Sequence, residues 1–257
     1  MNNNLNYEIK FIKNNFDKIR KLGYIKCEYN DTGGPGRKLE KVLLGKKPDN
    51  LRKPDFGNFE LKTYNGNNKY NITLFSLIPY VDNMEFDDIM NFFLSFNKPS
   101  TKLSFDNLVL PTFYLKVDTK KINFYKNRYK FAIFFDDLNR KMILKCYDEN
   151  FNLLPNKIFW YYDKIINEFK KKMKNLAFVN YTKRKVKNVL YCKYEKINFL
   201  VCDDEERIIE MLKNGTINLS FNVSSKYDDL NNVIPYYRGI KFEINEKDLD
   251  KLYFKYL

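Results

Sequence analysis

Two carboxylates and a lysine lie close together in the sequence, at Asp55, Glu60 and Lys62. Residues 59–64 alternate like a strand, so Glu60 and Lys62, two positions apart, should leave the same face. Asp55 arrives from the preceding loop and can bring a second carboxylate to the same point. Such a pair suits Mg²⁺ that must also hold phosphate oxygens, and Lys62 could orient a water or neutralise charge on a phosphorane-like transition state. Glu40, on a short helix after a glycine-rich turn, is a candidate third acid.

The spacing of these residues is a weak signal by itself, because Asp163, Glu168 and Lys170 repeat it. Around that second copy, apolar residues recur at helical spacing, and on a helix Asp163 and Glu168 would lie more than about 100° apart around the axis. We interpret the second copy as a solvated helix face. The chemistry of the first copy therefore depends on the strand that carries it.

The composition excludes several rival chemistries. The chain has no histidine among its 257 residues, which rules out Ser-His-Asp and Cys-His triads, His-ligated zinc and an imidazole base. Its four cysteines show no C-x-x-C spacing, so neither a zinc site nor a disulfide framework is indicated. The N-terminus lacks the apolar run of a signal peptide and no stretch is long enough to cross a membrane, which predicts a cytoplasmic protein without a membrane partner.

The positive charge has two explanations. Lys and Arg total 46 against 32 Asp and Glu, a formal net charge of +14. Codon usage in an AT-rich genome favours Lys, Asn, Ile, Tyr and Phe and would explain much of this excess. A polyanion partner would explain it as well, because a basic surface attracts phosphate and releases counterions on binding. Charge alone does not decide between them.

The remaining pattern predicts helices and strands mixed along the whole chain, the α/β or α+β class. Periodicity and capping residues predict helices at 5–19, 37–44, 85–94, 158–174, 203–212 and from 246. Alternation and β-branched or aromatic runs predict strands at 59–64, 70–78, 113–117, 129–135, 141–147, 176–181, 189–199, 216–223 and 239–244. Turn residues at 65–68 suggest that 70–78 returns as a hairpin partner of 59–64.

A longer, gapped pattern surrounds Asp55, Glu60 and Lys62. It consists of Gly34-x-Gly-x-x-Leu-Glu40, Leu43-Leu-Gly45, Pro54-Asp-x-Gly-x-x-Glu-Leu-Lys62 and Thr73-Leu-Phe-Ser76. This pattern resembles the MvaI/BcnI restriction endonucleases, relatives of the mismatch-repair nicking enzyme MutH within the PD-(D/E)xK nuclease superfamily. The resemblance is dense from about residue 32 to residue 79, and fainter elements follow at 212–217 and 238–244.

The resemblance implies a monomeric, Mg²⁺-dependent enzyme that hydrolyses phosphodiester bonds of double-stranded DNA at a short recognition sequence. It implies one endonuclease domain over 1–257, a mixed sheet flanked by helices, with a catalytic lobe (motif in 33–78) and a recognition lobe (elements toward 212–244) around a DNA cleft. Asp55 and Glu60 would ligate the metal, Lys62 would position or activate water, and Glu40 would support the site. A companion DNA methyltransferase could belong to the same system, and the sequence does not decide whether one protects the host.

Four residues are candidates for contacting DNA: Arg37, Asn222, Tyr237 and Arg238. In the C-terminal elements the family pattern tends to show Arg and His where this chain has Asn222 and Tyr236-Tyr-Arg238, and Arg where it has Glu243. Arg reads guanine in the major groove, whereas Asn suits adenine. We therefore expect a target different from the GC-rich CCNGG type.

Rival interpretations stay open at this point. A MutH-like enzyme would nick one strand at the command of partners, and a basic module with a decayed site would bind DNA without cutting it. Arg37 could touch a phosphate or cap a surface helix. The basic tracts at 170–174 and 183–187 could contact the DNA backbone or form a solvated surface.

Overall fold

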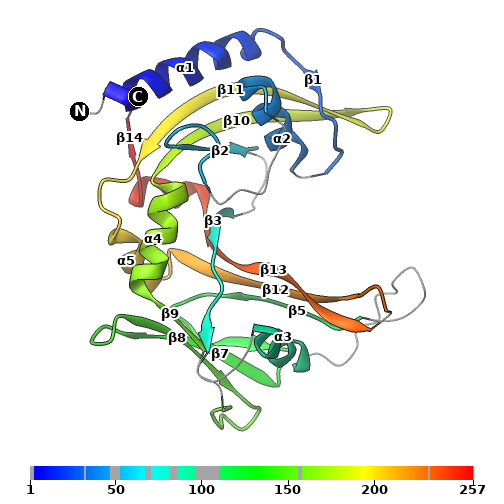
Figure 1. Cartoon of the computed structure of the whole chain (residues 1–257), viewed down its shortest axis with the longest axis vertical. Coiled ribbons are helices and arrows are strands. Elements are labelled where there is room, and N and C mark those ends of the chain that lie inside the picture. Colours follow the sequence, from blue (N-terminus) through cyan, green and yellow to red (C-terminus); the bar gives the residue numbers. More distant parts are fainter. Residues whose placement is uncertain are drawn as a thin grey trace. The chain divides into compact units, whose positions relative to one another are not determined.

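The computed structural model describes residues 3–31, 33–46, 53–66, 71–81, 86–96, 110–155, 158–230 and 232–256. The chain divides into two compact units (Figure 1). Unit 1 comprises Met1–Tyr70, Glu168–Glu205 and Leu249–Leu257, and unit 2 comprises Asn71–Asn167 and Glu206–Asp248. The chain thus leaves unit 1, builds most of unit 2 and returns twice.

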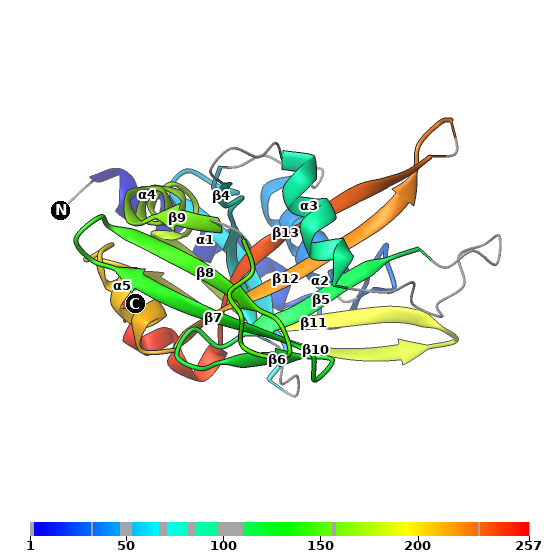
Figure 2. The same cartoon turned by 90° about the horizontal axis from the view of Figure 1, so that it is seen from below.

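The sheet of unit 1 has the order β1 (Ile25–Lys26), β11 (Val189–Val201), β10 (Asn175–Val186) and β2 (Phe59–Tyr64), and β14 (Phe254–Lys255) pairs with β11. All neighbours are antiparallel except β2 and β10, which run parallel. Since β2 pairs only with residues 175–180 of β10, the hairpin of β10 and β11 continues beyond the end of β2. Figure 2 shows these two strands side by side along that extension.

Two helices cover one face of this sheet: α1 (Asn3–Arg20) and α2 (Gly34–Leu44). Their apolar side chains form one core with alternate strand residues, a cluster that includes Ile12, Phe16, Leu39, Leu43, Phe59, Ala177, Val179 and Cys192. The helix predicted at 5–19 is confirmed. The helix predicted at 37–44 begins earlier, at Gly34, because Pro35 suits a first helical turn, and it ends at Gly45 in the left-handed conformation (φ 68°).

Unit 2 contains two sheets. The first has the order β3 (Ile72–Ser76), β13 (Val233–Ile244), β12 (Ile217–Tyr227) and β5 (Thr112–Val117). The helix α3 (Phe86–Ser95) packs on one face of it, where Phe93 meets Phe113 and Phe221 (Figures 1 and 2).

The second sheet of unit 2 has the order β4 (Tyr80–Val81), β9 (Ile158–Tyr161), β8 (Lys141–Tyr147), β7 (Tyr129–Asp136) and β6 (Asn123–Tyr125). The helix α4 (Tyr162–Met173) leads from this unit back into β10 of unit 1. The helix α5 (Arg207–Lys213) and the 3₁₀ helix η1 (Glu246–Lys251) flank the strands β12 and β13 in sequence. None of the described helices is long and apolar enough to cross a membrane.

Two elements were predicted with the wrong partner or type, and the helix predicted at 203–212 begins only at Arg207. Residues 72–76 do form a strand, but β3 pairs antiparallel with β13 in unit 2, not with β2. Residues 158–161 form the strand β9 between β4 and β8 before the helix begins at Tyr162. Apolar and aromatic runs of this length fit a buried strand or a helix equally, and sheet pairing decided the outcome. Several predicted strands are also longer, above all β10, β12 and β13.

The start of α2 yields a prediction on stability. A Cβ atom at Gly34 would lie 2.3 Å from the backbone carbonyl oxygen of Tyr29, so Gly34→Ala should displace the loop before the helix. We expect a loss of about 1–3 kcal/mol, the usual cost of overpacking, seen as a lower unfolding midpoint. Gly66→Ala is the matched control, because a Cβ there meets none of the described atoms within 4 Å. Equal midpoints for both variants would contradict the close approach.

Candidate active site

The parallel pairing of β2 with β10 defines which residues of β2 share a face. Phe59 and Leu61 belong to the core under α1 and α2, so Glu60 and Lys62 point to the opposite face. There, Lys62 Nζ donates a hydrogen bond to Glu60 Oε1 at 2.7 Å. The strand predicted at 59–64 is confirmed, and with it the common side of these two residues.

Asp55 is held beside them by a tight loop. Phe56 and Phe59 exchange backbone hydrogen bonds of 3.0 and 2.8 Å, and Gly57 supplies a positive φ of 54°. The loop therefore turns back on the strand, and the Leu61 backbone N–H donates to Asp55 Oδ2 at 2.8 Å. Burial raises the pKa of the Glu60 carboxyl most, and the negative charge of Asp55 is close enough to raise it further.

The helix α1 anchors this loop. Glu8 accepts hydrogen bonds from the backbone N–H and the side-chain amide of Asn58 at 3.1 and 3.0 Å. Phe11 stacks on Phe56 with ring centroids 4.7 Å apart. On the other side, Lys46 Nζ donates to the backbone carbonyl oxygen of Asp55 at 2.6 Å. The carboxylate of Asp55 is thus positioned mainly through contacts of the adjacent loop residues Phe56 and Asn58 with α1.

Glu60 is the electrostatic centre of the site. The residue is buried, at 2% relative exposure, and this burial is the main reason why the pKa of its carboxyl is raised. Lys62 opposes the shift, and so does Lys172, whose Nζ lies 3.6 Å from Glu60 Oε1. One carboxylate therefore lies within reach of two ammonium groups.

Lys172 is a site residue that the sequence did not reveal. It belongs to the last turn of α4, in the basic tract that we had interpreted as either DNA-contacting or solvated. The helix leads almost directly into β10, and Leu176 of β10 is the register partner of Glu60. A lysine three positions before a strand gives no signal unless the partner of that strand is known.

The donor set fits a hard divalent cation. Glu60 Oε2 is buried and has no hydrogen-bond partner among the described residues, so one oxygen of the carboxylate stands available. A second carboxylate, Asp55, lies close by, and carboxylate oxygens with remaining water positions are what Mg²⁺ prefers. Within the described ranges, no group of three or more His, Cys, Asp or Glu side chains is arranged to hold a metal ion by itself.

Two other candidates of this region lie on α2. Glu40 is half-buried on this helix, next to Leu39 in the core, and its support of the metal site stays a prediction. The Arg37 side chain is held by its neighbours: it donates to Asp31 Oδ2 at 2.6 Å, and its guanidinium lies 4.3 Å from the ring centroid of Tyr29. A contact of Arg37 with a phosphate would have to compete with Asp31.

The other DNA-contacting candidates lie in unit 2, on β12 and β13. The pairing of these strands shifts register between Phe221, opposite Ile240, and Val223, opposite Tyr237. Asn222 therefore faces a bulge made by Arg238 and Gly239, where Gly239 has a φ of 94°. The backbone brings Asn222, Tyr237 and Arg238 to one place; the side chains of Tyr237 and Arg238 lie outside the described structure.

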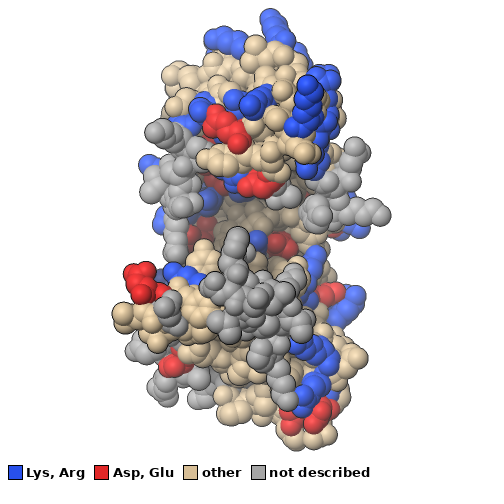
Figure 3. Space-filling view, turned by 90° about the vertical axis from the view of Figure 1, so that its right-hand side faces the viewer, with Lys and Arg blue, Asp and Glu red and all other residues tan. Residues whose placement is uncertain are grey.

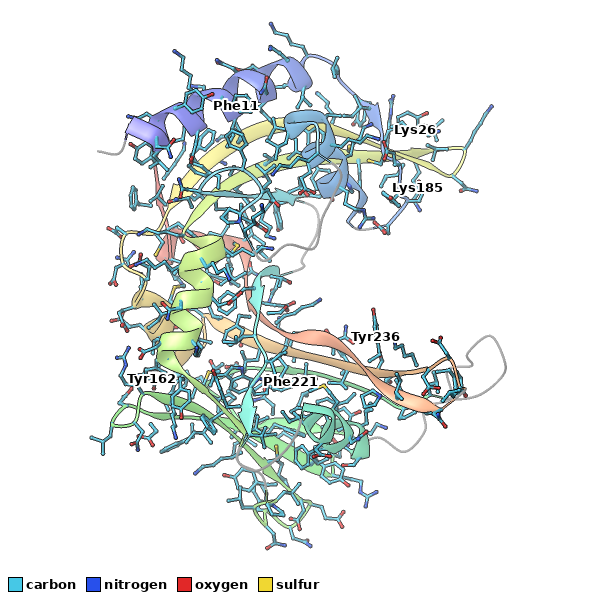
Figure 4. The ribbon with its side chains drawn as sticks, in the orientation of Figure 1. Phe11, Lys26, Tyr162, Lys185, Phe221 and Tyr236 are labelled. Atoms are coloured by element: carbon cyan, nitrogen blue, oxygen red, sulfur yellow. The ribbon has the colours of Figure 1, made fainter. Side chains whose placement is uncertain are left out.

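An exposed tyrosine accompanies Asn222. Tyr114 of β5 is its register partner on the other side and is 64% exposed. Since Phe221 and Val223 are buried, Asn222 and Tyr114 lie on the sheet face away from α3. Tyr236, also exposed, lies further along β13 (Figure 4). Sequence reasoning missed Tyr114, because nothing in a single strand indicates its neighbour.

The sequence of this chain matches a family model as well. The model of the MvaI/BcnI restriction endonuclease family matches residues 13–253. The chain belongs to this family. No curated protein sequence matches it significantly. Among solved structures, restriction endonuclease MvaI in complex with cognate DNA substrate is similar with a TM-score of 0.79 and 22% identity, over 99% of this chain and 98% of that one. MvaI in the absence of DNA is similar with a TM-score of 0.57 and 18% identity, over 99% and 97%.

Membership of the MvaI/BcnI family confirms the resemblance seen in the sequence and makes the chain a sequence-specific deoxyribonuclease. The similarity to MvaI confirms the mixed α/β, restriction-endonuclease-like fold. Enzymes of this kind generally use divalent metal ions, which agrees with the carboxylate pair of Asp55 and Glu60.

The raised pKa of Glu60 predicts a pH-dependent effect of Glu60→Gln on stability. Burial favours the neutral carboxyl, so the wild-type protein loses stability as pH rises through the raised pKa, and the variant lacks this titration. In metal-free buffer, the variant should unfold at a higher temperature than wild type at about pH 8, and the difference should shrink toward about pH 4. Thermal unfolding at several pH values measures this, and a variant that is less stable at high pH would refute the assignment.

Proposed function

We propose that this chain is a cytoplasmic, Mg²⁺-dependent type II restriction endonuclease that acts as a monomer on double-stranded DNA at a short specific sequence. The observation that carries the proposal is the contact of Lys62 with Glu60 beside Asp55, with Glu60 Oε2 left unpartnered. The complex of MvaI with cognate DNA supports duplex DNA as the substrate. A methyltransferase that protects the same sequence is the expected companion, because host DNA would otherwise be cut.

Asp55 and Glu60 would hold the Mg²⁺ through their carboxylate oxygens. When bound, the ion supplies Lewis-acid stabilisation of phosphate charge and a more acidic water. Lys62 keeps its ammonium at Glu60 and can donate another of its N–H groups to the attacking water. This hydrogen bond would orient a lone pair of the water oxygen toward the phosphorus atom. Lys172 adds a second positive charge that can stabilise the charge growing on the phosphoryl oxygens. Glu40 would support the site from α2.

Unit 1 would be the catalytic lobe in this proposal, and β12 and β13 of unit 2 would supply base reading. Asn222 carries an amide that suits adenine in the major groove, and in the backbone register Tyr237 and Arg238 of β13 lie opposite this part of β12 as further candidates for base reading. Glu243, where the family pattern tends to show Arg, accepts a hydrogen bond from Thr73 at 3.3 Å. A carboxylate at that position cannot donate to guanine.

Digestion of purified DNA tests the proposal. With Mg²⁺, the protein alone should cut AT-rich and GC-rich plasmids into defined linear fragments, and sequencing of the ends should give one short target that is not of the CCNGG type. Cleavage at CCNGG would contradict the altered reading surface. Open circles without linear product would favour the MutH-like nicking enzyme, and tight binding without any cutting would favour the inactive module.

Substitution of single lysines distinguishes the contribution of Lys62 to the cleavage rate from that of Lys172. Lys62→Ala should lower the cleavage rate about a hundredfold or more while DNA binding persists, because it removes a group that acts on the reacting water. Lys172→Ala should lower the rate about tenfold, since its charge lies one step further from the reaction. Lys171→Ala is the matched control: it removes a neighbouring exposed lysine of the same helix turn and should leave the rate unchanged. Equal rates for the variants at 171 and 172 would refute the second cation.

A further inference from the structure

The sheet face that carries Glu60 and Lys62 continues past the active site. In register, Lys62 lies beside Phe178 of β10, and Tyr64 lies beside Asn180. The Tyr64 and Phe178 rings stack with centroids 5.8 Å apart, so the two strands stay in contact up to this level. Beyond Asn180 the face belongs to the extended hairpin of β10 and β11 together with β1.

Side-chain alternation assigns the next residues to the same face. On β10 it continues through Thr182 and Arg184, whose register partners on β11 are Lys193 and Tyr191, and Lys26 of β1 is the partner of Tyr191. Side-chain contacts agree with this assignment: Arg184 lies 4.1 Å from the ring centroid of Tyr24, and the Tyr24 hydroxyl lies 3.5 Å from Thr182 Oγ1.

Four cations lie along this part of the face: Lys26, Arg184, Lys193 and Lys196. We call them the hairpin cation row. Lys26, Arg184 and Lys196 are exposed, and the Lys193 side chain is 43% exposed. Glu195 is the acid among them, at 4.0 Å from Lys193. Figure 3 looks toward the end of unit 1 where this hairpin lies, and Lys and Arg side chains gather there.

The opposite face of the hairpin base serves packing. Tyr181, Leu190 and Cys192 belong to the core beneath α1 and α2, and the lysines that follow on that side are Lys183 and Lys185. Both faces of the hairpin end are therefore basic, but one of them is continuous with the catalytic residues. Figure 4 shows Lys26 and Lys185 at this end of the sheet.

The distances match the spacing of duplex DNA. Arg184 lies six residues along β10 from Phe178, the register partner of Lys62. At about 3.3 Å per residue this is about 20 Å, and at about 3.4 Å per base pair it corresponds to about six base pairs of duplex. A DNA backbone whose scissile phosphate lies at Lys62 can thus reach Lys26 and Arg184 without bending.

We propose that the hairpin cation row binds the phosphate backbone of duplex DNA that flanks the cleavage site, about six base pairs from the scissile bond. This inference rests on the proposed function, because it needs a duplex at Lys62. The contact is independent of sequence, since ammonium and guanidinium groups on a sheet face meet phosphates rather than base edges. It anchors the duplex while other residues select the target.

Paired charge variants test the inference. One variant carries Lys26→Gln and Arg184→Gln on the catalytic face, and the matched control carries Lys183→Gln and Lys185→Gln on the other face of the same hairpin. Each removes two positive charges from one place, so a general effect of net charge is equal in both. Fluorescence anisotropy without divalent ions measures binding to two duplexes, one ending at the recognition sequence and one extending about ten base pairs beyond it on both sides.

Wild type and the control variant should bind the long duplex more tightly than the short one. The catalytic-face variant should lose about tenfold or more in affinity for the long duplex, and its slope of log affinity against log salt should fall by about two. Equal losses in both variants, or no gain from the longer duplex in wild type, would overturn the inference even when cleavage is intact. If wild type cuts no DNA with Mg²⁺, the proposed function itself fails.

Discussion

The burial of the Glu60 carboxylate between two lysines is the constraint on which the rest of unit 1 depends. A carboxylate taken out of water is costly unless opposite charges and hydrogen bonds compensate it. Lys62 reaches it from the same strand, and Lys172 reaches it from the end of α4. Even so its pKa stays raised, because burial and Asp55 outweigh the two ammonium groups. A site that holds unfavourable negative charge in this way is prepared for a cation.

The chain topology of unit 1 brings the second lysine, Lys172, to Glu60. Because β2 and β10 are parallel, the chain needs a long crossover between them, and most of unit 2 together with α4 lies within this crossover. The return through α4 delivers Lys172 next to Glu60 just before β10 begins. One face of the sheet is covered by the apolar sides of α1 and α2. Glu60 and Lys62 therefore lie on the other face, and the same face extends into the hairpin cation row.

Local patterns predicted the elements that depend on neighbours in sequence. The strand 59–64, the helix α1 and the end of α2 at Gly45 all rest on periodicity or caps, and they were predicted correctly. Pairings between strands that are distant in sequence were not predicted correctly. The strand β3 pairs with β13 near the C-terminus, although turn residues at 65–68 suggested β2 as its partner. Lys172 was missed for the same reason, since its place beside Glu60 arises from strand register. Glycine-rich and acidic motifs are local in sequence, which is why the family could be identified from them. Lys172, the second ammonium group beside Glu60, could not be identified in this way.

The net positive charge has two explanations, codon usage and a polyanion partner, and the positions of the basic residues in the structure distinguish between them. Many basic side chains are engaged in ion pairs that hold surface elements together, such as Arg140 with Asp163 and Glu206, or Lys174 with Glu205. Codon usage can set how many lysines a chain contains, but it has no means of placing them in strand register. Lys26, Arg184 and Lys193 come from three strands and share a face only because β1, β10 and β11 pair as they do. A polyanion is the partner that such a row fits, because phosphates repeat along one direction as these cations do.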